Sequence, residues 1–122
     1  MTPTIGARLI EAVRVRDEEA IASCFTADAR FRALVPSGVR ERAGAEEAAS
    51  LIAGWFADST EFDLVDPRSA TVGDRLYIAY LIHGVEEGQP YVVEQHLYCT
   101  IADDRIEGAD LLCSGFRPRV AR

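Results

Sequence analysis

The chain has 122 residues, and 20 acidic against 13 basic side chains give it a formal net charge of −7 at pH 7. Its length suits a single domain, residues 1–122, that is large enough to bury a core, and its 48% hydrophobic content argues against disorder. Every basic residue is an arginine, no basic cluster occurs, and no apolar run approaches the roughly 20 residues of a membrane span. Neither nucleic acid nor a membrane is therefore predicted as a partner.

Two helices are predicted at the start of the chain. Thr2 and Pro3 are typical of a helix cap and a first-turn proline, and apolar residues then recur at helical spacing over residues 5–13. Asp17 can cap a second, short helix that runs through Cys24, because its carboxylate accepts hydrogen bonds from first-turn N–H groups.

A short strand and a longer helix follow. Residues 31–35 are predicted as a strand that ends at Pro36 and Gly38, and residues 45–57 give the strongest helical pattern of the chain. Apolar residues form one stripe along that helix at i, i+3, i+4 and i+7 spacing. The stripe consists of Ala48, Leu51, Ile52, Trp55 and Phe56.

From residue 61 onward the apolar pattern changes to a period of two, which predicts strands. The predicted strands are residues 61–65 extending toward 72, 75–84, 91–102 and 105–116. The turns between them, at residues 73–74, 86–88 and 103–104, are short, and short turns join antiparallel neighbours. Helices followed by such strands predict an α+β domain with the helices on one face of the sheet.

The strand predicted over residues 75–84 is largely apolar on both faces, which is unusual for an antiparallel strand with one wet side. One face carries Leu76, Ile78, Tyr80 and Ile82, and the other carries Tyr77, Ala79, Leu81 and His83. Because the helices cover only one face, we expect a second copy of the chain to cover the other, in a homodimer that forms through the sheet. A loop or the C-terminal tail is the alternative cover.

Five segments carry motifs that point to one family. They are residues 24–31 (CFTADARF), 54–56 (GWF), 73–80 (GDRLYIAY), 103–106 (DDRI) and 111–118 (LLCSGFRP). With the order of the elements, these segments resemble a bacterial subgroup of the SnoaL-like branch of the NTF2-like superfamily over nearly the whole chain. The resemblance implies a cone-shaped α+β fold, in which a strongly bent antiparallel sheet wraps around three N-terminal helices and leaves a deep, mostly apolar pocket.

The resemblance leaves the function open, because this superfamily includes isomerases, polyketide cyclases, epoxide hydrolases, dehydratases and proteins that only bind a ligand. Similar cyclases carry an aspartate on the last strand, at a position that falls near Leu111 here. This chain has leucine both there and at Leu97, the second expected pocket position. The lack of charge at these positions favours a binding protein over an acid–base enzyme.

The register of the last hairpin decides which side chains share a face. If residues 103–104 form the turn, an unbroken ladder places His96 and Asp110 on opposite faces. A bulge at Gly108 shifts the later register by one residue and brings them to the same face. We predict the bulge, because strongly bent sheets need such irregularities.

His96 and Asp110 are the candidate catalytic residues. In an isomerase, cyclase or dehydratase that needs no cofactor, His96 would act as base or acid and Asp110 would orient it. In the alternative interpretation, both side chains lie with Glu94 and Tyr98 on the outer face of the sheet, as a polar part of a subunit interface.

The inner face is predicted to line the pocket. The candidate pocket residues are Arg32, Trp55, Tyr80, Gln95, Leu97, Leu111, Cys113 and Phe116. Gln95 is the most informative of them, because an amide among apolar neighbours needs hydrogen-bond partners, which the Tyr80 hydroxyl or a ligand carbonyl can supply. Arg30 and Arg32 are either solvated strand residues or, for one of them, a cation that holds an anionic group at the pocket mouth.

The three cysteines, Cys24, Cys99 and Cys113, have neither the spacing of a disulfide framework nor that of a metal site. A cytoplasmic protein without metal or cofactor is therefore expected. The sequence predicts a protein that binds a small apolar molecule, for example one with a carbonyl group, and the enzyme that uses His96 and Asp110 is the alternative.

Overall fold

The computed structural model describes residues 4–120. The helices are α1 (Ile5–Arg14), α2 (Glu18–Ser23) and α3 (Ala45–Trp55). The strands are β1 (Phe25–Val35), β2 (Gly38–Ala43), β3 (Ser59–Val72), β4 (Arg75–Glu86), β5 (Gln89–Ala102), β6 (Arg105–Cys113) and β7 (Arg117–Pro118). The predicted cap at Thr2 and Pro3 lies outside the described residues, and the Thr4 side chain caps α1 by accepting a hydrogen bond from the Ala7 N–H.

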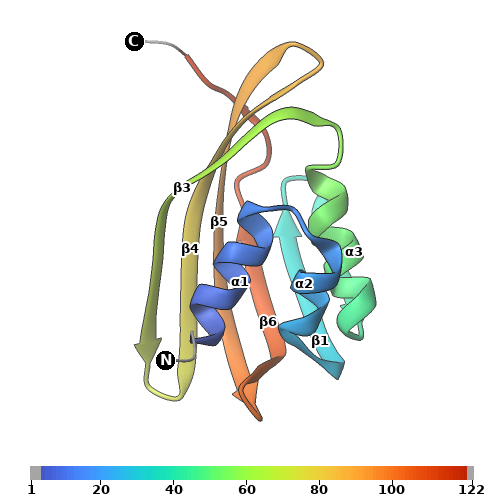
Figure 1. Ribbon diagram of the computed structural model, residues 1–122, viewed down its shortest axis with the longest axis vertical. Coiled ribbons are helices and arrows are strands. Elements are labelled where there is room, and N and C mark those ends of the chain that lie inside the picture. Colours follow the sequence, from blue (N-terminus) through green and yellow to red (C-terminus); the bar gives the residue numbers. More distant parts are fainter. Residues whose placement is uncertain (1–3, 121–122) are drawn as a thin grey trace.

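The strands form one sheet in the order β2-β1-β6-β5-β4-β3, with β7 added beside β5. The three helices lie on the same side of this sheet (Figure 1), which confirms the α+β class. The sheet is mixed and not purely antiparallel, because β1 runs parallel to β6. Short turns force consecutive strands to be antiparallel, but β1 and β6 are separated by most of the chain, so no turn constrains their relative direction.

Strand β2 is an element that the sequence did not predict. It pairs with β1 in a hairpin, in which Val35 lies opposite Gly38, and Gly38 adopts a positive φ of 131° in the tight connection. Its residues alternate between half-buried and exposed, so the strand lacks the apolar alternation that marks a core strand. Strand β1 begins at Phe25, six residues earlier than predicted.

The predicted bulge in the last hairpin is confirmed. The β5–β6 register shifts between Thr100 and Ile101, so that Thr100 lies opposite Gly108 and Gln95 opposite Cys113. A Cβ on Gly108 would lie 2.9 Å from the Thr100 hydroxyl oxygen, which explains why glycine occupies this position. A second irregularity bends β3 between Val65 and Arg68.

The core fills most of the space between the helices and the inner face of the sheet. Leu9 from α1, Ile21 from α2 and Ile52 from α3 are fully buried, and they belong to the same core cluster as Phe25 and Phe31 of β1. Each fully buried side chain of this size contributes about 1.5–3 kcal/mol to the stability of the fold. The predicted stripe of α3 is buried in part, since Ile52 and Phe56 are buried whereas Trp55 is only partly covered.

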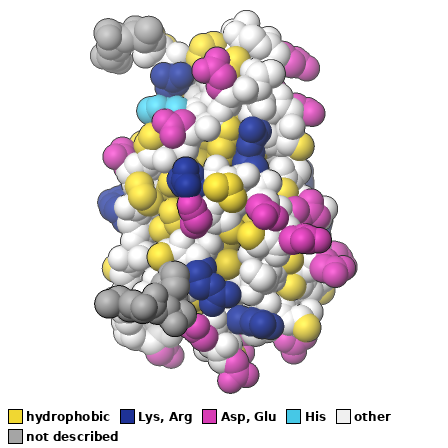
Figure 2. Space-filling view, in the orientation of Figure 1, with side chains coloured by type: hydrophobic (Ala, Val, Ile, Leu, Met, Phe, Trp, Pro, Cys, Tyr) yellow, Lys and Arg dark blue, Asp and Glu magenta, His cyan; other side chains and the backbone are white. Residues whose placement is uncertain are grey.

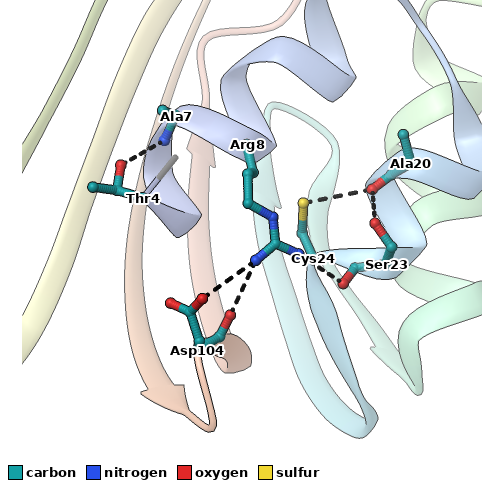
Figure 3. A network of polar contacts seen from close by, with 7 residues as sticks. All are labelled: Thr4, Ala7, Arg8, Ala20, Ser23, Cys24 and Asp104. Atoms are coloured by element: carbon teal, nitrogen blue, oxygen red, sulfur yellow. Dashed lines mark hydrogen bonds and ion pairs between the residues drawn. The ribbon is translucent and has the colours of Figure 1, made fainter. Parts of the chain in front are cut away.

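Arg8 ties three distant segments together (Figure 3). One guanidinium nitrogen donates to the Asp104 backbone oxygen at 3.4 Å and lies 3.6 Å from the Asp104 carboxylate, and the other donates to the Ser23 backbone oxygen at 3.4 Å. The contact joins α1 to the end of α2 and to the β5–β6 turn. It therefore links these segments at the end of the fold opposite the one at which α3 finishes.

Candidate functional site

A hollow of about 380 Å³ opens at the end of the fold where α3 and β1 finish; these two ends lie in the upper half of Figure 1, below the tip of the β4–β5 hairpin. Its walls come from the β1–β2 turn, the C-terminal end of α3, β5, and the segment that follows β6. The residues that line the hollow are Val35, Pro36, Ser37, Trp55, Phe56, Gln95, Cys113, Ser114, Gly115, Phe116 and Arg117.

A buried polar contact forms the inner end of the hollow. The Tyr80 hydroxyl donates a hydrogen bond of 2.6 Å to Gln95 Oε1, and Gln95 Nε2 donates to Cys113 Sγ at 3.5 Å. The Gly115 backbone N–H donates to the same sulfur at 3.4 Å. Gln95 is fully buried beside the hollow. Thiol sulfur is a weak acceptor, and Nε2 carries two protons, so the amide nitrogen can donate a further hydrogen bond.

Aromatic rings form the walls nearer to solvent. Phe116 packs between Tyr91, with ring centroids 4.7 Å apart, and Phe56, at 5.9 Å. Phe116 is nevertheless 44% exposed, because it lies on the segment that crosses the opening. Trp55 lines the same opening from the last turn of α3. The walls are therefore apolar and the inner end is polar, an arrangement typical of small-molecule sites.

The structure brings four of the predicted pocket residues together around this hollow: Trp55, Gln95, Cys113 and Phe116. Tyr80, Leu97 and Leu111 are buried in the core beneath it and are not part of its lining. Gln95 links Tyr80 to the hollow through its amide.

Arg32 was predicted to line the pocket, and this prediction is wrong. Its side chain is exposed on the outer face of β1, where it forms a 2.8 Å ion pair with Asp110. The reason is the alternation of the strand, in which Phe31 and Ala33 are fully buried and the residue between them must point outward.

His96 and Asp110 share the outer face, as the bulged register predicts, but each hydrogen-bonds to a different partner. His96 Nδ1 lies 2.7 Å from the Tyr77 hydroxyl, and its Nε2 lies 2.9 Å from a Glu94 carboxylate oxygen. Asp110 pairs with Arg32. An open depression of about 470 Å³ beside His96 and Glu94 lies on this outer face.

The inner side of the sheet has few polar groups. Among the described residues, the buried polar side chains are those of Gln95 and Ser59, and the Ser59 hydroxyl is hydrogen-bonded to the Tyr91 hydroxyl at 2.6 Å. Burial raises the pKa of the Tyr80 phenol well above its ordinary value and raises the pKa of the Cys99 thiol from 9.0 to about 12. Both groups are therefore neutral at pH 7, and the Tyr80 hydroxyl acts as a hydrogen-bond donor.

Several residues of the hollow were missed by the sequence reasoning. Ser114, Gly115 and Arg117 line it because β6 ends at Cys113 and the chain then turns across the opening, whereas the prediction continued the strand to Phe116. Gly115 has a positive φ of 78° and packs so closely against Pro36 that a Cβ would overlap the proline ring. The Ser-Gly pair was the available signal, because this pair favours a turn.

Two further features concern residues 4–120 as a whole, namely metal ligation and membrane spanning. No group of three or more His, Cys, Asp or Glu side chains in this part of the chain could hold a metal ion. None of its helices is both long and apolar enough to cross a membrane.

The comparison with family models identifies the class of protein. The model of the SnoaL-like domain matches residues 7–108, which is most of the chain. The chain therefore belongs to the SnoaL-like family of the NTF2-like superfamily. A search of curated proteins finds no match.

Solved structures share the fold at low sequence identity. A hypothetical protein with a ketosteroid isomerase-like fold from Catenulispora acidiphila, in complex with trimethylamine, has a TM-score of 0.77 and 19% identity, over 94% of this chain and 88% of that chain. A candidate polyketide cyclase from Xanthomonas campestris pv. campestris has a TM-score of 0.72 and 21% identity, over 88% and 86% of the two chains. An LEH-like epoxide hydrolase from M. tuberculosis has a TM-score of 0.69 and 12% identity, over 90% and 80%. These similarities show the fold alone.

Proposed function

We propose that this protein binds a small, largely apolar molecule in the hollow, and that the ligand carries a carbonyl or similar hydrogen-bond acceptor. The buried Gln95 amide is the observation that carries this proposal. The amide lies at the inner end of an apolar hollow, and its oxygen is already bonded to Tyr80. Among the described residues, its nitrogen has only a sulfur as acceptor. A ligand carbonyl would give the amide nitrogen a stronger partner than the thiol.

The size and lining of the hollow support a ligand of one or two rings. Its volume of about 380 Å³ lies within the usual range of roughly 300–1,000 Å³ for small-molecule sites. The Trp55 and Phe116 rings offer flat apolar surfaces to such a molecule. Binding would remove these surfaces from water, which is the main source of affinity in sites of this kind.

The same geometry weighs against the acid–base alternative. Among the described residues, the lining of the hollow includes no histidine, aspartate or glutamate. His96 is hydrogen-bonded to Tyr77 and Glu94 on the outer face, separated from the hollow by the sheet. Proton abstraction from a ligand needs a base within hydrogen-bond reach of the proton that is transferred.

The proposal is tested with Prodan, a neutral fluorescent naphthalene that carries one ketone. We expect Prodan to bind the wild-type protein with increased emission, and Gln95→Leu to weaken binding roughly three- to tenfold through the lost hydrogen bond. The same naphthalene without the carbonyl oxygen should bind both proteins equally. Gln89→Leu is the matched control. Gln89 lies on the same strand, but it is exposed and lies at the start of β5, opposite Glu86 and away from the hollow.

Two outcomes would contradict this proposal. The first is that the wild-type protein binds neither probe. The second is that Gln95→Leu and Gln89→Leu change Prodan affinity equally. Because Gln95→Leu leaves the Tyr80 hydroxyl without its partner, the double variant Tyr80→Phe/Gln95→Leu is measured as well. This double variant removes both polar groups together, so the protein should stay stably folded. It should bind Prodan as weakly as Gln95→Leu does.

We further propose that the protein forms a homodimer through the outer face of the sheet. This face exposes Leu34 and Leu112, which lie opposite each other on β1 and β6. Beside them lie the paired charges of Arg32 and Asp110. In a chain with a net charge of −7, two copies repel each other over most of their surface. A patch that is apolar and whose charges balance avoids this repulsion. It therefore supports a second copy of the chain as the partner at this face.

A further inference from the structure

A groove of about 580 Å³ lies on the helical side of the fold, between α2, α3 and the start of β1. We call it the helix groove. It lies at the end of the fold where α3 begins, whereas the hollow lies where α3 finishes. The helix groove is therefore separate from the proposed ligand site, and the helical side is also the side away from the proposed dimer face.

The floor of the helix groove is apolar and consists mainly of small side chains. Phe25 and Ala49 are buried, Ala22 and Ala45 are partly buried, and Ala27 is exposed. Ala45 and Ala49 are four residues apart, so they lie on one face of α3. The distance between two packed helices depends on the side chains at their contact, so alanines let another helix approach closely.

The rim of the helix groove is acidic. Glu18 and Glu19 lie in the first turn of α2, and Glu46 lies in the first turn of α3. Within residues 4–120 these three exposed carboxylates form no ion pair, and Arg105 is the one basic side chain that lines the groove. Figure 2 shows acidic side chains gathered at the right, over α2 and α3. This rim attracts a positively charged partner.

Acidic residues in a first helical turn also stabilise the helix itself, because they lie near its positive end. Glu46 and Glu47 both have this role in α3. Only Glu46 lines the helix groove, whereas Glu47 lies beside Arg42 of β2 in a different depression. The two glutamates therefore separate the effect of a first-turn charge from an effect of the groove.

We propose that the helix groove binds a basic amphipathic helix of another protein. The apolar face of that helix lies on the alanine floor, and its lysine or arginine side chains lie against Glu18, Glu19 and Glu46. Recognition of this kind, in which an amphipathic helix lays its apolar face into a groove, is a recurrent way of binding a peptide. The charges of the rim and of the partner are complementary.

Two features favour a helix over a small molecule as the occupant. Small-molecule sites have a few polar groups that fix the orientation of the ligand. The buried polar side chains among the described residues are those of Gln95 and Ser59, and neither lines the helix groove. In addition, Glu18 and Ala22 on α2, like Ala45 and Ala49 on α3, are spaced by four residues. Such rows form the ridges between which the side chains of another helix pack.

The test uses a fluorescein-labelled peptide of about 18 residues, roughly five helical turns, with leucine and alanine on one face and lysine on the other. A second peptide has the same composition in scrambled order, so it keeps the charge and loses the apolar face. Both are titrated with the wild-type protein, and fluorescence anisotropy measures the affinity. We expect the amphipathic peptide to bind more tightly than the scrambled one.

Two matched pairs of variants locate the site. Glu46→Gln should weaken binding of the amphipathic peptide roughly two- to fivefold, the size of an exposed ion pair, and Glu47→Gln should leave it unchanged. Ala27→Gln places a longer side chain on the floor and should weaken binding roughly three- to tenfold. Ala43→Gln is its control, because Ala43 is equally an exposed strand residue but does not line the helix groove.

Each opposite result would overturn the proposal. If Glu46→Gln and Glu47→Gln weaken binding equally, the peptide responds only to net charge and the helix groove is not its site. If the two peptides bind equally well, the occupant is not an amphipathic helix. A lack of saturable binding up to about 1 mM peptide would contradict the docking surface itself. The same holds if the small cation benzyltrimethylammonium binds at Glu46 and the peptide does not.

Discussion

Tyr80 and Gln95 lie opposite each other on β4 and β5, and their side chains join in a hydrogen bond of 2.6 Å inside an apolar core. Both residues are buried. A polar pair of this kind stabilises the fold only while both members are present, because a buried group that loses its partner keeps the full cost of its lost hydration. The site and the core therefore depend on the same contact.

At the residue scale, Tyr80→Phe should lower the free energy of unfolding by about 1–3 kcal/mol, because it removes the donor to Gln95 Oε1 and leaves that oxygen buried without a strong partner. Urea denaturation measures the change. Tyr98→Phe is the control. Tyr98 is 48% exposed on the outer face of β5, so its hydroxyl can hydrogen-bond to water. Equal stabilities for the two variants would show that the Tyr80–Gln95 contact contributes nothing to the core.

The residues of the hollow differ in how far the sequence could predict them. Gln95 and Cys113 follow from strand alternation combined with the bulge at Gly108, both of which are local patterns. Arg117 does not, because its position depends on where β6 stops and how the chain crosses back over β5. Such a crossing is set by tertiary contacts, which have no signature in a single sequence.

At the scale of elements, the end of the β4–β5 hairpin depends on the close approach of Tyr91 to Gly84. The two residues lie opposite each other in the ladder, and the Tyr91 ring covers the glycine so closely that any Cβ there would overlap the ring and its hydroxyl. The same ring bonds to Ser59 of β3 and packs against Phe116. One glycine on β4 thus allows the Tyr91 ring of β5 to meet β3 and the segment after β6 beside the hollow.

Gly84→Ala should consequently lower the free energy of unfolding by about 1–3 kcal/mol, because the Tyr91 ring must move and its contacts with Ser59 and Phe116 are lost. Gly54→Ala, in α3, is the opposite case: no atom lies within 4 Å of the added Cβ. That variant should gain up to about 1 kcal/mol from the better helix propensity of alanine. Thermal unfolding of both variants checks the prediction, and a Gly84→Ala protein as stable as the wild type would contradict it.

Helices and antiparallel hairpins were predictable from the sequence because their signals are short-range. The spacing of apolar residues located α1 and α3, and turn residues located the β3–β4, β4–β5 and β5–β6 connections. Strand β2 was not predictable, since half of its positions are exposed and charged side chains occupy several of them. The parallel β1–β6 pairing was missed for another reason: it joins segments that no local pattern relates.

At the scale of the whole molecule, the two faces of the sheet differ in what covers them. The inner face meets the helices and, at one end, forms the hollow. The outer face has no covering element among the described residues, yet it exposes Leu34 and Leu112 at 51% and 52%. Exposed leucines beside each other on a central part of a sheet are typical of an interface. Dimerisation would bury them and leave the opening of the hollow in solvent.

Leu112→Arg should therefore convert the proposed dimer into a monomer. A twofold axis through this face would bring the introduced charges close together in an apolar surrounding, and their desolvation and mutual repulsion oppose association. The monomer should stay folded, because Leu112 is half exposed within one chain. Sedimentation velocity measures the change, and Val72→Arg is the control, since Val72 is equally exposed at 54% but lies at the far end of β3. A wild-type monomer, or a dimer that survives Leu112→Arg and Val72→Arg alike, would contradict the proposed interface.

Because Gln95 faces the opposite side of the sheet, Gln95→Leu should leave the dimer intact while it weakens Prodan binding, and this separation distinguishes the two faces in a single pair of variants.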